Sequence, residues 1–131
     1  MKVNGLGGVF IKAKNPDQLY RWYEDNLGLQ RDSQGRFIVP VERLLPDYTL
    51  VSFINDDKVP SSDQSCTLNF QVDHLASLLS NLAEAGVHIV DHLEENPNGR
   101  FAWIFDPEGN KIELWEPRPY DTSVIDLPEP E

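Results

Sequence analysis

Two sets of helix start and stop signals stand 58 positions apart in the chain, and this spacing limits the architectures open to it. Asn15 followed by Pro16 suits the start of a helix, because an Asn side chain can accept a hydrogen bond from an unpaired backbone N–H and proline fits the first helical position. Gly28 can adopt the left-handed conformation that ends a helix. Asp73 and Gly86 repeat the first and last of these signals. The sequence therefore predicts two short helices, one in each half.

Short segments with strand character surround both predicted helices. One segment precedes each helix and three follow it: residues 9–13, 29–31, 36–41 and 48–54 in the first half, and 67–72, 87–90, 100–105 and 111–115 in the second. The order is therefore βαβββ, twice. We expect an α+β domain of two βαβββ modules, about residues 5–55 and 66–117, that form a cupped mixed sheet with the helices on its outer face.

Alternation within the predicted strands assigns side chains to the two faces of the sheet. Ile112 and Leu114 share one face, whereas Lys111, Glu113 and Trp115 share the other. Residues 106–110, Asp-Pro-Glu-Gly-Asn, form the sharpest turn signal and join this strand to residues 101–105. We expect the apolar set to pack against a helix and the polar and aromatic set to line the concave face, where a ligand would bind.

The overall composition excludes several classes of protein. The 131 residues suffice for one domain, which we place at residues 1–117, followed by an acidic, proline-containing tail at 118–131. The net charge of −11 argues against nucleic acids and anionic membranes as partners. The single Cys66 excludes an internal disulfide. Because no 18-residue apolar segment occurs, we expect a cytoplasmic protein.

Two motifs make the chain resemble a known superfamily. They are Asn15-Pro16-x-x-Leu19-x-x-Trp22-Tyr23-x-x-x-Leu27-Gly28 and Gly99-Arg100-Phe101-x-Trp103-x-x-Asp106-Pro107-Glu108-Gly109-Asn110-x-Ile112-Glu113-Leu114-Trp115-Glu116. With the paired βαβββ order, they resemble the vicinal oxygen chelate superfamily, which contains glyoxalase I, extradiol dioxygenases, fosfomycin-resistance enzymes and bleomycin-binding proteins. The resemblance covers about residues 5–117. It implies an open cup built from two modules, and a homodimer.

The resemblance also implies four positions for metal ligands. The fourth matches Glu113, but the first falls at about Gly8 and the third at about Thr67, and the second falls within residues 51–53, which hold no carboxylate or imidazole. We therefore predict no metal or other cofactor, with a divalent metal remaining an alternative. His74 lies at the start of the second helix, and His88 and His92 would stand about 13 Å apart along a strand, too far apart to share one ion.

The candidate site residues are those predicted to line the cup. Glu113 is the candidate catalytic residue, as a general base, although it could instead recognise a cationic or hydroxylated ligand or only organise the cup by pairing with a nearby Lys or Arg. The candidate ligand-binding residues are Phe10, Lys12, Phe53, Asn69, Gln71, Arg100, Trp103 and Trp115.

Three functions remain open at this point. The first is a glyoxalase/bleomycin-resistance-like protein that binds a small molecule in the sheet cavity without the usual metal. The second is a metal-dependent lyase or isomerase of the glyoxalase I type with non-standard ligands. The third is an interaction module whose acidic tail docks onto a partner.

Overall fold

The computed structural model describes residues 2, 6–40, 49–53 and 66–117. Its elements in chain order are α1 (Pro16–Leu27), β1 (Gln30–Arg31), β2 (Phe37–Ile38), β3 (Leu68–Gln71), α2 (Leu75–Glu84), β4 (His88–Ile89), β5 (Glu94–Asn96), β6 (Gly99–Phe105) and β7 (Lys111–Glu116). The predicted α+β class is confirmed. The predicted tail at 118–131 lies outside the described residues.

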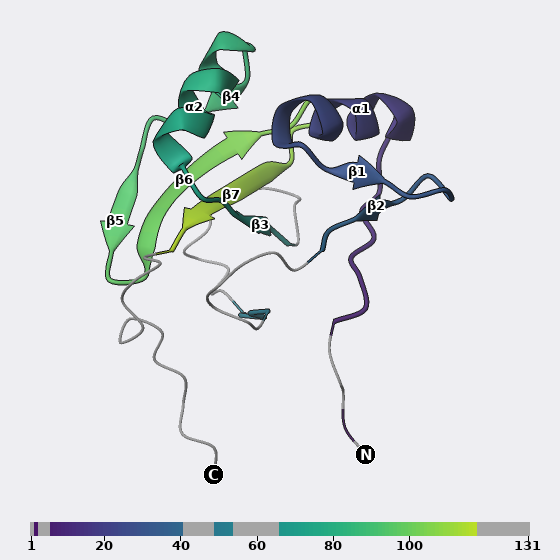
Figure 1. The fold of residues 1–131 in the computed structure, drawn as a ribbon, viewed down its shortest axis with the longest axis horizontal. Helices are drawn as coiled ribbons and strands as arrows, with labels where there is room; N and C mark the ends of the chain where they lie inside the picture. Colours follow the sequence, from purple (N-terminus) through teal and green to yellow (C-terminus); the bar gives the residue numbers. More distant parts are fainter. Residues whose placement is uncertain (1, 3–5, 41–48, 54–65, 118–131) are drawn as a thin grey trace.

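The larger sheet is mixed, as expected. Its strands run in the order β3-β7-β6-β4, and β5 also pairs with β6. Strand β3 is parallel to β7, whereas the other pairs in this sheet are antiparallel. Strands β1 and β2 form a separate antiparallel pair beside α1 (Figure 1).

The core lies between the helices and one face of the larger sheet. Its buried residues are Tyr23 from α1, Leu75 and Leu82 from α2, Ala102 and Ile104 from β6, and Ile112 and Leu114 from β7. All four strand residues occupy even positions, so they share one face of the sheet. The helices therefore cover the face that alternation assigned to them, and the odd-numbered side chains of β6 and β7 point to the opposite face.

Helix α1 begins and ends at the predicted residues. The Asn15 side chain accepts a hydrogen bond from the Gln18 backbone N–H at 3.3 Å, and Gly28 ends the helix with φ of 72°. The helices are 12 and 10 residues long, and none in the described part of the chain is long and apolar enough to cross a bilayer.

The start of helix α2 differs from the prediction. His74, not Asp73, is the N-cap residue, and its side chain makes no capping hydrogen bond. The Glu116 carboxylate instead accepts a hydrogen bond from the Leu75 backbone N–H at 2.7 Å. A residue distant in sequence thus replaces the local cap, and a local pattern cannot reveal such a contact.

The turn between β6 and β7 holds the start of α1. The Glu108 carboxylate accepts hydrogen bonds from the backbone N–H groups of Lys14 at 2.8 Å and Asn15 at 2.9 Å. These two bonds lower the pKa of Glu108. The turn has the predicted geometry, with Gly109 at φ of 83° and its N–H bonded to the Asp106 carbonyl.

Asp106 is the one buried charged residue among those described, and it is only 5% exposed. Its carboxylate accepts hydrogen bonds from the Tyr23 hydroxyl at 2.8 Å, the Asn110 side-chain amide at 2.7 Å, and the backbone N–H groups of Glu108 and Asn110, both at 2.9 Å. Burial raises the pKa of Tyr23, and the bond to Asp106 raises it further. This cluster ties α1 to the β6–β7 turn.

The described residues of the first half contain fewer strands than predicted. Residues 9–13 and 49–53 form no strand, and the predicted strands at 29–31 and 36–41 shorten to β1 and β2. Alternation shows which side chains could be buried, but a strand also needs a hydrogen-bonding neighbour. No described residue supplies one to these two segments, and Phe10 and Phe53 are 93% and 97% exposed.

Candidate functional site

The sheet face opposite the helices carries aromatic and polar side chains. Strand β6 contributes Phe101, Trp103 and Phe105, and β7 contributes Lys111, Glu113 and Trp115. On β3, Asn69 lies opposite Glu113 and Gln71 lies opposite Trp115. Residues directly opposite in neighbouring strands point to the same face. We call these eight residues the open sheet face.

Glu113 is at the centre of a hydrogen-bond network on the open sheet face. One carboxylate oxygen accepts a hydrogen bond from the Trp103 indole N–H at 3.1 Å, and the other accepts one from the Asn69 side-chain amide. Each oxygen keeps capacity for a further donor. The carboxylate is therefore held in place by two neighbouring strands and remains able to receive a ligand.

Stacked aromatic rings lie near this carboxylate on the same face of the sheet. The Phe101 and Trp115 rings are 6.0 Å apart at 3°, and the Trp115 N–H donates to the Asn98 carbonyl at 2.8 Å. His92 stacks on Trp103 with ring centroids 5.7 Å apart at 14°. Ring pairs of this kind present flat π faces, on which a planar molecule can stack.

The structure brings together four of the predicted ligand-binding residues with Glu113: Asn69, Gln71, Trp103 and Trp115. Arg100 occupies an even position, so it lies on the same face of β6 as the buried residues, and it pairs with the exposed Glu95 at 3.7 Å. Phe10, Lys12 and Phe53 are exposed and belong to segments outside the sheet.

Several residues near the open sheet face were absent from the predicted site. His88 stacks on Phe105 with centroids 4.9 Å apart, and Glu94 of β5 lies opposite Phe101. Alternation within residues 101–105 could have identified Phe105. Nothing could have identified Glu94, because the polar sequence of β5 lacks the apolar alternation typical of a strand.

The residues present do not fit the metal site that the resemblance implies. In the described ranges, no group of three or more His, Cys, Asp or Glu side chains could hold a metal ion. Glu113 is the one matching position with a carboxylate, and one carboxylate cannot supply the three or four ligands that a metal of this class needs.

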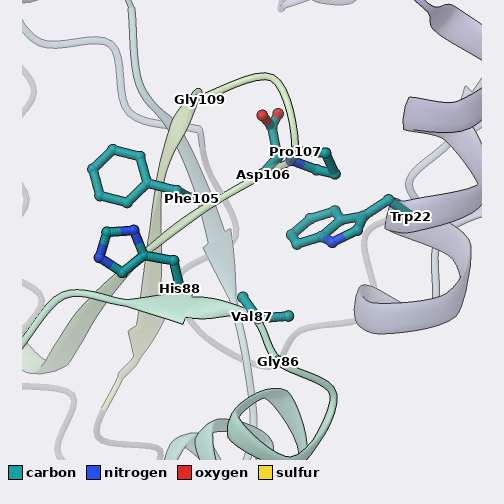
Figure 2. Close-up of a pocket in the computed structure, with 8 residues that line it drawn as sticks. All are labelled: Trp22, Gly86, Val87, His88, Phe105, Asp106, Pro107 and Gly109. Carbon is teal, nitrogen blue, oxygen red and sulfur yellow. The ribbon is translucent and has the colours of Figure 1, made fainter.

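A hollow of about 540 Å³, which shares only Phe105 with the open sheet face, lies between α1 and β4 (Figure 2). Trp22, Val87 and Pro107 line it together with His88 and Phe105. Its carboxylate, Asp106, already accepts four hydrogen bonds. The hollow contains neither Glu113 nor Trp103, so the open sheet face has the stronger set of groups for binding a ligand.

Comparison with known proteins agrees with this architecture. The profile of the Glyoxalase/Bleomycin resistance protein/Dioxygenase superfamily matches residues 5–114. A comparison with curated proteins found no match. A glyoxylase/bleomycin resistance protein/dioxygenase domain from Frankia sp. EAN1pec is similar in structure, with a TM-score of 0.60 and 19% identity over 95% of this chain and 100% of that one.

Two further solved structures are similar over most of their length. An integron cassette protein from V. cholerae has a TM-score of 0.58 and 19% identity over 92% of this chain and 98% of that one. TnmS3, an antibiotic binding protein from Streptomyces sp. CB03234, has a TM-score of 0.59 and 24% identity over 90% and 99%. With a family match that covers most of its length, the chain belongs to the Glyoxalase/Bleomycin resistance protein/Dioxygenase superfamily.

Proposed function

We propose that this protein binds a small planar molecule on the open sheet face, without the metal site of its superfamily. The observation that carries the proposal is the placement of Glu113 between Asn69 and Trp103, beside the parallel rings of Phe101 and Trp115. The rings offer stacking surfaces, and the carboxylate offers a fixed acceptor for a ligand N–H or O–H group. In this proposal Glu113 recognises the ligand and does not act as a catalytic base.

The comparisons support binding of this kind. The similar structure of TnmS3 is that of an antibiotic binding protein. A fold of this type can therefore bind a small organic molecule, although fold likeness alone does not transfer a ligand. For this chain, the proposal rests on the residues of the open sheet face.

Binding can be tested with a panel of planar compounds that includes acridines, anthraquinones, quinolines and flavins. Thermal shift and native mass spectrometry identify binders, and tryptophan quenching then gives dissociation constants. Replacing Trp103 or Trp115 with phenylalanine should weaken a binder roughly three- to tenfold, because part of the stacking surface is lost. Trp22→Phe is the matched control, since Trp22 packs against the core on the helix side of the sheet.

Two results would refute the proposal. One is the absence of any binder in the panel. The other is a loss of affinity in Trp22→Phe as large as in Trp103→Phe. The metal-free part of the proposal has its own test: protein purified without chelators should contain less than about 0.1 equivalent of Ni, Zn, Mn, Fe or Co, since a working metal site must be occupied.

We also propose that the chain forms a homodimer through its first half. The support is the exposure of large apolar side chains there, 58% for Leu6, 93% for Phe10 and 97% for Phe53. Val9, Phe10 and Ile11 are consecutive exposed apolar residues, and a cluster of this kind commonly marks a protein–protein interface. Light scattering should give about twice the 14.9 kDa chain mass, and Phe10→Ser should shift it toward the monomer. A monomeric wild-type protein at tens of micromolar would contradict this.

A further inference from the structure

We infer that the ligand of the open sheet face is a cation, a planar aromatic molecule that carries a protonated amine. This inference rests on the proposed function and adds to it the charge of the ligand. Its basis is that two carboxylates close to the aromatic rings have no ionic partner among the described residues, while the nearby arginine lies on the other face.

The first carboxylate is Glu113, whose contacts are hydrogen bonds from two neutral donors, Asn69 and Trp103. The ion pairs within the described part of the chain are Arg31–Glu24, Arg36–Asp32 and Arg100–Glu95, and Glu113 belongs to none of them. Neutral donors orient a carboxylate but leave its full negative charge in place. Half-burial on the sheet makes that charge more effective than it would be in bulk water.

The second carboxylate is Glu94, on the strand next to Phe101. Strand β5 lies along the outer edge of β6 (Figure 1), and its register places Glu94 opposite Phe101. Phe101 in turn lies opposite Trp115 and is parallel to its ring. The Glu94 carboxylate accepts a hydrogen bond from the neutral Asn96 amide at 3.1 Å. Glu94 is thus the cross-strand neighbour of Phe101, and Glu113 lies two residues from Trp115 along β7, so each ring of the stacked pair has one carboxylate close to it.

The cations near this part of the sheet leave the face negative. Arg100 follows the parity of the buried residues and pairs with Glu95, on the face opposite Glu94. Lys111 shares the open sheet face, and its ammonium lies 6.0 Å from the centroid of the Trp103 ring. The described strands place the carboxylates of Glu94 and Glu113 and the ammonium of Lys111 on this face. The chain as a whole carries a net charge of −11, which also attracts cations.

Rings and carboxylates select different parts of one molecule. Trp rings attract both a planar π system and a positive charge above their faces. A carboxylate forms its strongest hydrogen bonds with charged donors. A planar amine cation satisfies both groups at once, whereas an anionic compound of the same shape would meet two unpaired negative charges.

Three tricyclic compounds of similar size separate ring stacking from charge recognition: 9-aminoacridine, which is a cation at pH 7, neutral acridone, and anionic acridine-9-carboxylate. We expect 9-aminoacridine to bind at least about tenfold more tightly than acridone, and acridine-9-carboxylate to bind most weakly. The reason is that a hydrogen bond to a charged group lowers the dissociation constant by about tenfold or more. The affinity for 9-aminoacridine should also fall as salt is raised.

Three variants locate the source of the preference. Glu113→Gln and Glu94→Gln should each reduce the preference for 9-aminoacridine over acridone by about threefold or more. Glu95→Gln is the matched control, because it removes the same charge one residue away but from the other face of β5. Glu94 is exposed, so the Glu94→Gln variant should fold even if the loss of Glu113 disturbs the sheet.

The outcomes distinguish the two proposals. Binding of none of the three compounds refutes the stacking site, and the charge preference with it. Equal binding of 9-aminoacridine and acridone overturns the charge preference and leaves the stacking site standing. A preference reduced equally by Glu95→Gln and Glu94→Gln would also overturn it, since the effect would then come from the net charge of the protein.

Discussion

Replacing Tyr23 with phenylalanine should lower the free energy of unfolding by about 2 kcal/mol at pH 7. The ring stays, but the hydrogen bond of 2.8 Å from its hydroxyl to the buried Asp106 carboxylate is lost. A bond to a charged group contributes roughly 1.5–3 kcal/mol, and the lower half of this range applies because Asp106 keeps three other donors. Tyr20→Phe is the control on the same helix, since no hydrogen bond of its hydroxyl occurs among the described residues.

The pH dependence of this difference gives a sharper test. Burial and the Asp106 bond raise the pKa of Tyr23 above its ordinary value of 10.0, so near and above that pH the unfolded chain releases a proton that the folded chain retains. Because of Tyr23, the free energy of unfolding of the wild type should then fall by roughly 1.4 kcal/mol per pH unit. The Tyr23→Phe variant lacks this group and should not show this loss. The difference between the two proteins should therefore shrink between pH 9 and pH 11.

Urea unfolding followed by circular dichroism at pH 7, 9, 10 and 11 measures both quantities. A difference below about 0.5 kcal/mol at pH 7 would show that the hydroxyl contributes little to stability. A difference that stays constant up to pH 11 would contradict the assignment of a protonated, hydrogen-bonded Tyr23 in the folded state.

Three further changes test the contacts that organise the sheet. Gly99→Ala should lower the free energy of unfolding in urea by more than about 2 kcal/mol, because the new Cβ would lie 2.2 Å from the Glu116 carbonyl oxygen and Gly99 has φ of 129°. Gly35→Ala is the control and should cost less, because a Cβ at this position has no atom within 4 Å. Glu116→Ala should lower stability by about 1 kcal/mol through loss of the cap on α2, and an unchanged midpoint would show that water replaces it. Glu108 has a lowered pKa, so its contribution is present above its ordinary value of 4.5 and is lost as the pH falls. Acid titration of Glu108→Gln should therefore show a shallower loss of stability than wild type, and identical acid curves would contradict this.

Much of the second half of the fold could be predicted because its signals are local and agree with one another. Alternation in residues 111–115 placed Glu113 and Trp115 on the face away from the helices, and the turn at 106–110 fixed which strands are neighbours. Alternation in residues 67–72 likewise placed Asn69 on this face. These residues form the centre of the proposed site.

The remaining features depend on partners distant in sequence. Glu95 turned out to pair with Arg100 because β5 lies beside β6, and no apolar alternation marks β5. Glu116, which lies 41 residues after Leu75, replaced the expected Asp73 cap. Residues 9–13 alternate as a strand would, but lack a neighbour among the described residues to complete it. Periodicity predicts which side chains are buried, but it does not predict which strands are hydrogen-bonded neighbours.

Glu108 in the β6–β7 turn and Glu116 at the end of β7 favour one order of assembly. Glu108 receives the N–H groups that precede α1, and Glu116 receives the first N–H of α2. The β6–β7 hairpin closes over a short turn, whereas Glu108 meets Lys14 across 94 residues, so the hairpin has the smaller entropy of closure. It can form first and offer both anchors to the helices. Amide exchange should accordingly be slowest in β6 and β7, and each helix should lose protection without unravelling this pair of strands.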